Sequence, residues 1–307
     1  MPPCNQCPRR CNADRERCAG YCGSGSEPVA SAVCLHTGEE PPLSGTKGIV
    51  NVFFAHCNLQ CLYCQNQQIS SSSISPSLVR YRGVEAIVAE IERLLPLSEG
   101  LVGFVTPSHF TQGVIDIVER LHSDGYNPTV VYNTGGYDSV ETLQQLEPYI
   151  DIYLPDFKYA DPLLAAGLSG APRYPEVAMA ALLEMRRQKG SGLLCDDRGI
   201  AYRGLIVRHL VLPGHVSNSL AVLEMLADNL PLNLHISLMA QYNPPPDTSR
   251  LVAAGYTELC RTITASEYSQ VANRYAELGF WNGWLQELEA HKTYRPDFDN
   301  ALNPFGS

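Results

Sequence analysis

The sequence predicts an α/β protein, an open or partial (β/α) barrel of six units with a cysteine-rich, metal-binding extension at its N-terminus. Two observations carry this prediction. Short apolar, β-branched runs alternate with longer amphipathic stretches from about residue 48 onward, and nine of the 11 cysteines fall within the first 64 of 307 residues. Apolar runs suit parallel strands buried on both faces, and strands alternating with helices build such a sheet. A doubly wound open sheet is the structural alternative.

The chain divides into three parts. Residues 1–45 are rich in Cys, Gly, Pro and Ser and poor in periodic apolar residues, so we expect an irregular segment that bound metal stabilises. Residues 46–280 form the barrel domain, and residues 281–307 form a C-terminal tail. The stretch at 281–288 is apolar enough to pack on the barrel, to cap its open edge or to contact a partner.

Six strands and six helices are expected in the barrel domain. The strands are residues 49–54, 101–105, 129–133, 151–154, 205–212 and 234–239. The helices are residues 84–95, 113–122, 139–147, 175–189, 217–228 and 265–278. Ser139 is a start signal for one helix, and Pro175 suits the first turn of the next. Parallel crossovers of this kind are right-handed.

The charge pattern excludes several classes of protein. The net charge is −10, with 32 acidic against 22 basic residues and no basic stripe, which argues against nucleic-acid binding. The N-terminus has no apolar run typical of a signal peptide, and the best apolar run, residues 204–213, is interrupted by Arg208 and His209. We therefore expect a soluble, cytoplasmic protein in a reducing setting, where clustered cysteines bind metal.

The sharpest motif is Cys57, Cys61 and Cys64, which directly follows the first expected barrel strand. Three thiolates on one loop can converge on a soft metal centre. Zinc usually takes four protein ligands, and His56 is an awkward fourth because it is adjacent to Cys57. Three cysteines on a four-iron cluster leave one iron open for a small molecule. A structural zinc loop with a distant fourth ligand is the alternative.

This C-x3-C-x2-C motif, with Tyr63 before the last cysteine, resembles that of radical S-adenosylmethionine enzymes. The wider chain resembles the uncharacterised iron–sulfur proteins homologous to the pyruvate formate-lyase activating enzyme. The segments that carry this closer resemblance are residues 36–48, 53–70, 104–110, 130–138, 151–161, 204–214 and 239–244. They are spread over most of residues 4–280.

The resemblance implies a [4Fe-4S] cluster on the three cysteines, with the open iron binding S-adenosylmethionine. Reductive cleavage then yields methionine and a 5'-deoxyadenosyl radical, which abstracts hydrogen from a substrate. Tyr63 would lie near the adenine. The resemblance also implies a reductant such as flavodoxin or ferredoxin. The substrate is a glycyl radical enzyme or, alternatively, another peptide or small molecule. A non-catalytic iron–sulfur, zinc-binding or electron-transfer protein is the alternative of another class.

Further positions are carried over from the resemblance, and all lie at strand ends, where barrel active sites form. Asn133 and Thr134 resemble an Asp-Thr-Asn-Gly stretch at a cation and cofactor site, with Asn133 in place of the acid. Asp156 and Lys158 match an Asp-x-Lys motif near the cofactor, or form an ordinary ion pair. Arg208 matches an arginine that faces the active site, and we expect it to bind a carboxylate or to lie near the cluster. Residues 135–136 could also be a simple turn.

One stretch departs from the family pattern. Such enzymes place a Gly-Gly-Glu-Pro-like stretch after the second strand to bind the methionine amino group, and here residues 106–109 read Thr-Pro-Ser-His. Thr106 and Ser108 could still accept hydrogen bonds. Residues 38–41 resemble the missing stretch, but they precede the cysteine loop and are not equated with it. His109 is a candidate catalytic base or a structural donor.

The N-terminal cysteines form a second group. Cys4, Cys7 and Cys11, together with Cys18 and Cys22, could close a zinc site or hold an auxiliary iron–sulfur cluster. The resemblance favours Cys4, Cys7, Cys11 and Cys22 as the ligands and leaves Cys18 spare. The spacing does not separate zinc from an iron–sulfur cluster. The remaining cysteines, Cys34, Cys195 and Cys260, are expected to be ordinary thiols.

Overall fold

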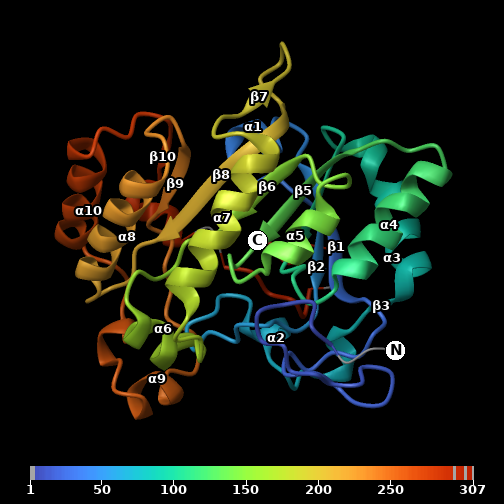
Figure 1. Ribbon diagram of the computed structural model, residues 1–307. Coiled ribbons are helices and arrows are strands. Elements are labelled where there is room, and N and C mark those ends of the chain that lie inside the picture. Colours follow the sequence, from blue (N-terminus) through green and yellow to red (C-terminus); the bar gives the residue numbers. More distant parts are fainter. Residues whose placement is uncertain (1–3, 293–294, 301–302, 306–307) are drawn as a thin grey trace.

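The computed structural model describes residues 4–292, 295–300 and 303–305. Within these residues ten strands form one mixed sheet, with helices packed along it (Figure 1). All six expected strands are present: β2 (Ile49–Phe54), β4 (Leu101–Val105), β5 (Thr129–Thr134), β6 (Ile152–Pro155), β8 (Ala201–Leu210) and β9 (His235–Met239). The six expected helices are present as α3 (Gly83–Leu94), α4 (Thr111–Ser123), α5 (Val140–Leu146), α7 (Tyr174–Lys189), α8 (Val216–Asn229) and α10 (Ala265–Glu277).

The strand order distinguishes the two expected architectures. Strands β2, β4, β5, β6, β8 and β9 are parallel neighbours in chain order, and β10 (Gly283–Leu285) continues the series beside β9. A doubly wound sheet would reverse its strand order at a switch point. Because this series has no reversal, the order is that of an open (β/α) arrangement. β10 also shows that part of the stretch at 281–288 extends the sheet edge.

One expectation for the N-terminal segment is wrong: residues 1–45 are not irregular throughout. Residues Val29–His36 form β1, which pairs antiparallel with β2 and is buried at every position except Leu35. The apolar run of this strand was obscured by the Cys-, Gly- and Pro-rich sequence on either side. Because β1 runs against β2, the residues after His36 return to the amino end of β2, where His36 lies opposite Ile49.

Several shorter elements complete the fold. They are α1 (Pro41–Ser44), α2 (Gln67–Ser70), β3 (Tyr81–Arg82), α6 (Pro162–Ser169), β7 (Leu194–Cys195), α9 (Ser249–Ala253) and the 3-10 turns Pro76–Leu78, Leu95–Leu97, Thr257–Cys260 and Leu288–Lys292. Among the described residues, no helix has both the length and the apolar character needed to cross a membrane.

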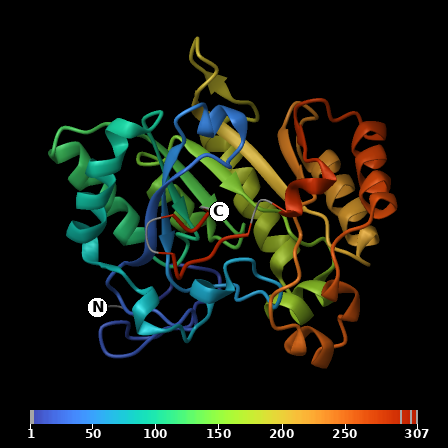
Figure 2. The same cartoon turned by 180° about the vertical axis from the view of Figure 1, so that it is seen from behind.

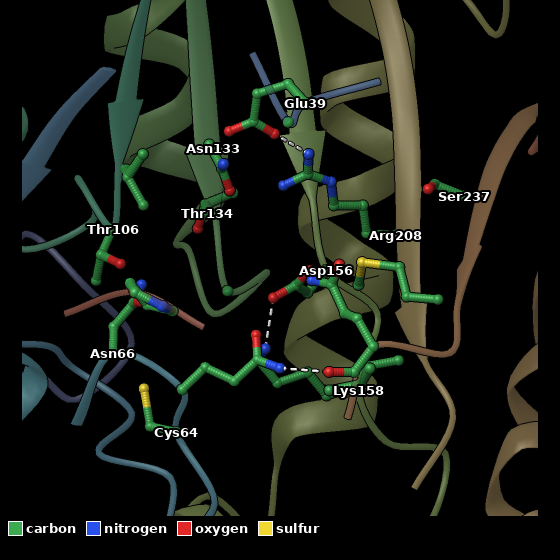
Figure 3. A pocket seen from close by; sticks show the side chains of 18 of the residues that line it. Glu39, Cys64, Asn66, Thr106, Asn133, Thr134, Asp156, Lys158, Arg208 and Ser237 are labelled. Carbon is green, nitrogen blue, oxygen red and sulfur yellow. Dashed lines mark hydrogen bonds and ion pairs between the residues drawn. The ribbon is translucent and has the colours of Figure 1, made fainter. Parts of the chain in front are cut away.

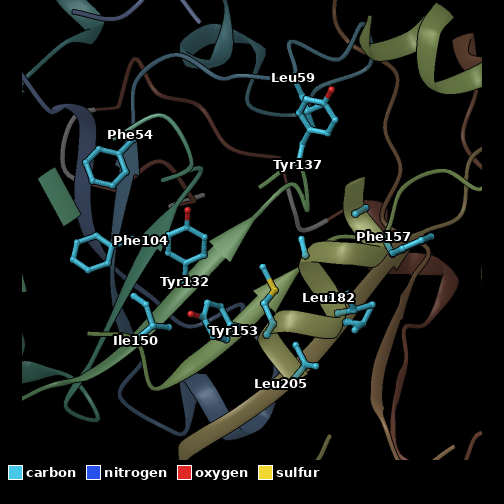
Figure 4. Close-up of a cluster of buried hydrophobic side chains, with 14 of the residues drawn as sticks. Phe54, Leu59, Phe104, Tyr132, Tyr137, Ile150, Tyr153, Phe157, Leu182 and Leu205 are labelled. Carbon is cyan, nitrogen blue, oxygen red and sulfur yellow. The ribbon is translucent and has the colours of Figure 1, made fainter. Parts of the chain in front are cut away.

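The main hydrophobic core lies between the sheet and its helices. Phe54, Phe104, Tyr132 and Tyr153, from four neighbouring strands, point to this face (Figure 4). The Phe54 and Phe104 rings stack with centroids 6.0 Å apart, and Tyr132 meets Tyr153 edge-on at the same distance. Such burial holds each strand in one register, because a shift by one residue would turn these rings to the opposite face. The residues that follow the strands are therefore held in fixed positions.

Residues 295–300 and 303–305 of the C-terminal tail lie on the opposite face of the sheet, in red in Figure 2. Phe298 is fully buried, and its ring lies 5.4 Å from that of Phe53. Its backbone N–H donates to Gln68 Oε1 at 2.9 Å, and its carbonyl accepts from Arg80 Nη2 at 2.6 Å. Phe305 packs on His36 with ring centroids 4.1 Å apart. The tail is therefore docked on β1 and β2 by both apolar and polar contacts.

Replacing Phe298 with alanine should release the tail without unfolding the barrel domain. Burial of a phenylalanine side chain is worth about 2–3 kcal/mol, and the tail has few other apolar anchors. The cost is limited by the free energy of docking, because the tail can detach while the sheet stays folded. Hydrogen exchange of residues 295–300 should become faster in the variant. Trp281→Ala is the control, since Trp281 is 71% exposed; equal protection in all three proteins would contradict this account.

Candidate functional site

A cavity of about 410 Å³ lies where the parallel strands end, inside the curve of the sheet (Figure 3). The carboxyl ends of parallel strands meet on one side of such a sheet, so residues far apart in sequence converge there. The ten residues predicted to hold the [4Fe-4S] cluster of the cysteine loop or S-adenosylmethionine all line this cavity: Cys57, Cys61, Tyr63, Cys64, Thr106, Asn133, Thr134, Asp156, Lys158 and Arg208.

The cysteine loop leaves β2 through a tight reversal. His56 and Gln60 both have positive φ angles, 71° and 58°, which non-glycine residues rarely adopt. The His56 N–H donates to the carbonyl of Ile69 at 2.6 Å, and its Nδ1 lies 2.8 Å from the carbonyl of Ser71. His56 thus closes the base of the loop and does not line the cavity, in keeping with its poor suitability as a fourth ligand.

The three thiols of this loop influence one another. Burial and the neighbouring Cys61 and Cys64 raise the pKa of Cys57 to about 12, and burial with Cys61 raises that of Cys64. Donors already point at two of the sulfur atoms: the Leu59 N–H lies 3.3 Å from Cys57 Sγ, and Ser169 Oγ lies 2.9 Å from Cys61 Sγ. Thiols become thiolates on binding a metal, so three cysteines on one loop are a donor set that fits a soft iron centre.

No three His, Cys, Asp or Glu side chains in the described part of the chain are grouped so as to hold one metal ion. In a four-iron cluster each thiolate binds a different iron, so the sulfur atoms lie farther apart than the ligands of a single ion. The fit of the loop to a cluster therefore rests on the three thiols that share the cavity.

Asp156 and Lys158, directly after β6, form an ion pair with both side chains less than a quarter exposed. Burial by itself would lower the pKa of Lys158, but the charges of Asp156 and Cys61 raise it well above its ordinary value. Tyr174 organises this turn: its buried hydroxyl lies 2.9 Å from the Lys158 N–H and from the carbonyls of Asp156 and Gly135. Sequence analysis did not select Tyr174, because no local motif marks it.

Hydrogen bonds to the side chain of Asp138 fix the stretch from Asn133 to Gly136. This buried carboxyl accepts from Thr134 Oγ1 at 2.5 Å and from the Tyr132 hydroxyl at 3.1 Å, and burial raises its pKa. The Gly136 N–H donates in turn to Thr134 Oγ1 at 3.2 Å. Thr134 is thereby held in place, while Asn133 presents its side chain to the cavity.

Residues 106–109, the stretch after β4 that differs from the family pattern, lie partly at the cavity and partly in the core. Thr106 lines the cavity with a φ of 59°, a strained conformation for a β-branched residue. Its N–H donates to the Asn133 carbonyl at 2.9 Å. His109 does not line the cavity; it is 1% exposed, and its Nε2 lies 2.9 Å from the Ala55 carbonyl. Burial lowers the pKa of His109 to about 3, so its position suits the structural alternative rather than a base.

Arg208 on β8 is bound to two carboxylates that sequence analysis set aside. It pairs with Glu39, and its Nε and Nη2 donate to the two oxygens of Glu40 at 2.8 and 2.5 Å. The side chains of both glutamates are less than a tenth exposed, and Asn51 Nδ2 donates to Glu39 at 2.8 Å. Burial would raise the pKa of Glu39, but Arg208 and His36 hold it below its usual range. The expected carboxylate for Arg208 thus comes from the chain itself.

The N-terminal cysteine segment is docked against the cysteine loop. The Arg9 guanidinium donates to the carbonyls of Asn58 at 2.7 Å and Ser169 at 2.8 Å, and it lies over the Tyr21 ring at 4.2 Å. Burial raises the pKa of Cys7 to about 11. Burial by itself would raise the pKa of Cys11, but hydrogen bonds from backbone N–H groups near its sulfur lower this pKa below its ordinary value.

Four of the N-terminal cysteines lie close enough to influence one another's thiols or to border the same glycine, whereas Cys18 lies apart from them. Cys7 is influenced by Cys4 and Cys22, and a side chain at Gly20 would contact the sulfur atoms of Cys11 and Cys22. Cys18 is exposed and lies 3.3 Å from the Asp14 carbonyl. A metal site on Cys4, Cys7, Cys11 and Cys22 stays a prediction.

Comparisons with known proteins extend the resemblance. No protein-family model matches the chain. An uncharacterized protein of Methanocaldococcus jannaschii is 28% identical over 281 residues, which are 89% of this chain and 75% of that protein. A domain of pyruvate-formate lyase-activating enzyme from Bacteroides vulgatus superposes on 61% of this chain and 99% of its own length at 16% identity, with a TM-score of 0.43.

SuiB of Streptococcus suis, in its crystal structure bound to S-adenosylmethionine, superposes on 80% of this chain with a TM-score of 0.50. The chain shares its fold with SuiB. At 11% identity the likeness concerns the fold alone, and the chain spans about half of SuiB, 54% of its length. The likeness drawn from the motif of the cysteine loop is thus joined by a likeness of fold to a protein crystallised with S-adenosylmethionine.

Proposed function

We propose that this chain is a radical S-adenosylmethionine enzyme that binds a [4Fe-4S] cluster on its cysteine loop and S-adenosylmethionine in the adjoining cavity. The observation that carries the proposal is the convergence of the three loop thiols with Lys158, Asp156 and Asn133 on one cavity. SuiB, which has the same fold, was crystallised with S-adenosylmethionine.

Each part of the cavity has a task in this proposal. With one electron from a reductant such as flavodoxin or ferredoxin, the bound cluster would cleave S-adenosylmethionine to methionine and a 5'-deoxyadenosyl radical, which would abstract a hydrogen atom from the substrate. Lys158 keeps its proton because Asp156 stabilises the ammonium, so it can donate to the carboxylate of S-adenosylmethionine. The buried Tyr63 ring offers an apolar surface for the adenine. The docked tail, with Phe305 in the cavity wall, keeps water away from a radical.

The substrate of this reaction falls into one of two classes. The resemblance to the activating enzyme favours a glycyl radical enzyme, whose backbone would lose a hydrogen atom. Another peptide or small molecule is the alternative, because the fold hosts more than one chemistry. The residues at the cysteine loop are the same for both classes, so the test below addresses the shared step.

The proposal is tested by anaerobic reconstitution with iron and sulfide, followed by reduction in the presence of S-adenosylmethionine. Formation of 5'-deoxyadenosine is expected, and it should disappear in Cys57→Ala because the loop then offers only two thiolates. Cys195→Ala is the matched control, since Cys195 is exposed on β7 and should not affect the yield.

Two results would contradict the proposal. One is a reconstituted and reduced cluster that binds S-adenosylmethionine and leaves it intact with glycyl-radical, peptide and small-molecule candidates, which would favour an electron-transfer protein. The other is a yield of 5'-deoxyadenosine that is equal in Cys57→Ala and the unmodified chain.

A further inference from the structure

The end of helix α6 lies against the cysteine loop (Figure 1). Gly170, in the left-handed conformation with a φ of 56°, ends this helix directly after Ser169. The Leu62 N–H of the loop donates to the carbonyl of Leu168 at 2.8 Å. The Arg9 guanidinium donates to the carbonyl of Ser169 at 2.8 Å. Hydrogen bonds to the backbone from two different segments therefore fix the place where the Ser169 side chain begins.

The Ser169 side chain points at a sulfur atom of the loop. Its hydroxyl donates to Cys61 Sγ at 2.9 Å, and the residue is 2% exposed. Cys61 is one of the three cysteines that line the cavity. A buried hydrogen bond has little competition from water and is electrostatically stronger than one at the surface. Ser169 is thus a fixed donor to one of the three predicted cluster ligands, and it comes from a helix 108 positions along the chain.

A second buried hydroxyl holds that of Ser169 in place. Tyr159 is fully buried, and its hydroxyl oxygen lies 2.7 Å from Ser169 Oγ and 2.8 Å from the Tyr63 hydroxyl. The single proton of Ser169 has two neighbours, the Tyr159 oxygen and Cys61 Sγ. A metal-bound thiolate accepts hydrogen bonds and donates none, so the Ser169 proton points to the sulfur once Cys61 is a ligand. The Tyr159 hydroxyl is then the neighbour that keeps Ser169 Oγ from turning away.

A donor at a cluster sulfur affects the reduction of the cluster. The one-electron reduction of [4Fe-4S]2+ to [4Fe-4S]+ adds one negative charge and makes or breaks no bond to the protein. Hydrogen bonds to the sulfur atoms are among the features that set the potential of such clusters. Because a hydroxyl directs its positive end at the sulfur, it stabilises the reduced form more than the oxidised form. The donor therefore raises the reduction potential.

We propose that Ser169 raises the reduction potential of the cluster on the cysteine loop by donating a hydrogen bond to Cys61 Sγ. Tyr159 is a positioning residue that acts through Ser169 by holding its hydroxyl in place. The proposal rests on the cluster of the function proposed above, but it does not depend on cleavage of S-adenosylmethionine. Its consequence is that a reductant transfers its electron to the cluster more readily than it would without Ser169.

The test is a potentiometric titration of the anaerobically reconstituted protein with titanium(III) citrate, without S-adenosylmethionine, followed by EPR spectroscopy. The signal of the loop cluster is the one that is absent from Cys57→Ala. In Ser169→Ala the ratio of reduced to oxidised cluster at a fixed potential should fall by about 3- to 10-fold, the effect of one hydrogen bond. At about 59 mV per tenfold for a one-electron couple, the midpoint potential should become about 30–60 mV more negative.

Three further variants separate the hydrogen bond from other effects. Ser169→Thr keeps the hydroxyl and should restore most of the potential. Tyr159→Phe leaves the Ser169 hydroxyl without its second neighbour, so the same ratio should fall by about 2- to 3-fold. Ser98→Ala is the matched control and should leave the potential unchanged. Ser98 is also buried, but its hydroxyl donates to the Leu95 carbonyl at 2.8 Å, before the amino end of β4.

A midpoint potential in Ser169→Ala that is equal to or above that of the unmodified chain would overturn the proposal. A potential in Ser169→Thr as low as in Ser169→Ala would do the same, because the hydroxyl would then not be the cause. Should Ser169→Ala fail to retain its cluster, Tyr159→Phe decides, and an unchanged potential there counts against the proposal.

The titration also distinguishes this proposal from the proposed function. If the cysteine loop of the unmodified chain held no cluster, both would fall. If the predicted shifts appeared in a protein that leaves S-adenosylmethionine intact, the role of Ser169 would stand and only the proposed enzyme activity would be contradicted. If S-adenosylmethionine were cleaved but all variants had equal potentials, only the role of Ser169 would fall.

Discussion

Replacing Arg208 with methionine is expected to lower the free energy of unfolding by about 3–5 kcal/mol, the cost of removing one partner from a buried ion pair. Methionine keeps the apolar stem of the side chain and removes the guanidinium, so the loss reports mainly on the charge and its hydrogen bonds. Glu39 and Glu40 would then lack a counter-charge, although the side chain of each is less than a tenth exposed. Urea denaturation at pH 7 measures this loss.

An arginine that forms ion pairs at the protein surface provides the control for this prediction. Arg274 also contacts two carboxylates, Glu224 and Glu277, but it lies at the surface, and Arg274→Met should cost less than about 1 kcal/mol. In a triple variant, Arg208→Met with Glu39→Gln and Glu40→Gln, most of the lost stability should return because no uncompensated charge remains. A loss as small for Arg208→Met as for Arg274→Met would contradict the account of a buried pair.

The two forms should also differ in how stability depends on pH. In the unmodified chain the pKa of Glu39 is lowered, so this residue stabilises the fold above the pKa of the unfolded chain, and the contribution is lost as pH falls through the folded value. Without Arg208, burial would raise the same pKa and make protonation favour the folded state. The stability difference between the two forms should therefore shrink on acidification.

Local sequence patterns were sufficient for much of this molecule. The cysteine loop could be predicted because its three thiols lie within eight residues of one another. Asn133, Asp156 and Arg208 could be placed on one side of the sheet because each lies at or near the end of an apolar run, and parallel strands end together. These inferences need only the strand period and the parallel arrangement.

Contacts between residues far apart in the sequence could not be predicted from local patterns. Glu39 and Glu40 reach Arg208, 168 or more positions away, only because β1 runs antiparallel to β2 and returns the chain to the cavity. The strand that causes this return was the one hidden by Cys-, Gly- and Pro-rich flanks. Tyr174 was visible only as the residue before Pro175, and its contacts with Gly135 and Lys158 depend on how α7 packs on the sheet.

Replacing Gly136 with alanine is expected to lower the free energy of unfolding by about 2–5 kcal/mol and to weaken the binding of S-adenosylmethionine. Gly136 has a φ of 76°, a left-handed conformation that costs about 1–2 kcal/mol for other residues. In addition, a Cβ atom there would overlap the carbonyl oxygen of Asp156 and lie 2.9 Å from the Tyr174 hydroxyl. Relieving that overlap adds about 1–3 kcal/mol, as in other overpacked sites.

Gly125→Ala separates the two contributions. Gly125 has a φ of 90°, and a Cβ atom there would meet nothing within 4 Å, so this variant carries the backbone cost alone. Because the overlap at Gly136 displaces Asp156, the Asp156–Lys158 pair should lose its position in the cavity, and calorimetry should show weaker binding only in Gly136→Ala. If both variants lost the same stability and bound S-adenosylmethionine equally well, Gly136 would be a simple turn. The predicted difference in stability and binding between the two variants requires that the turn after β5 packs directly on the turn after β6. Through this contact, the backbone at Gly136 positions the charged side chains of Asp156 and Lys158.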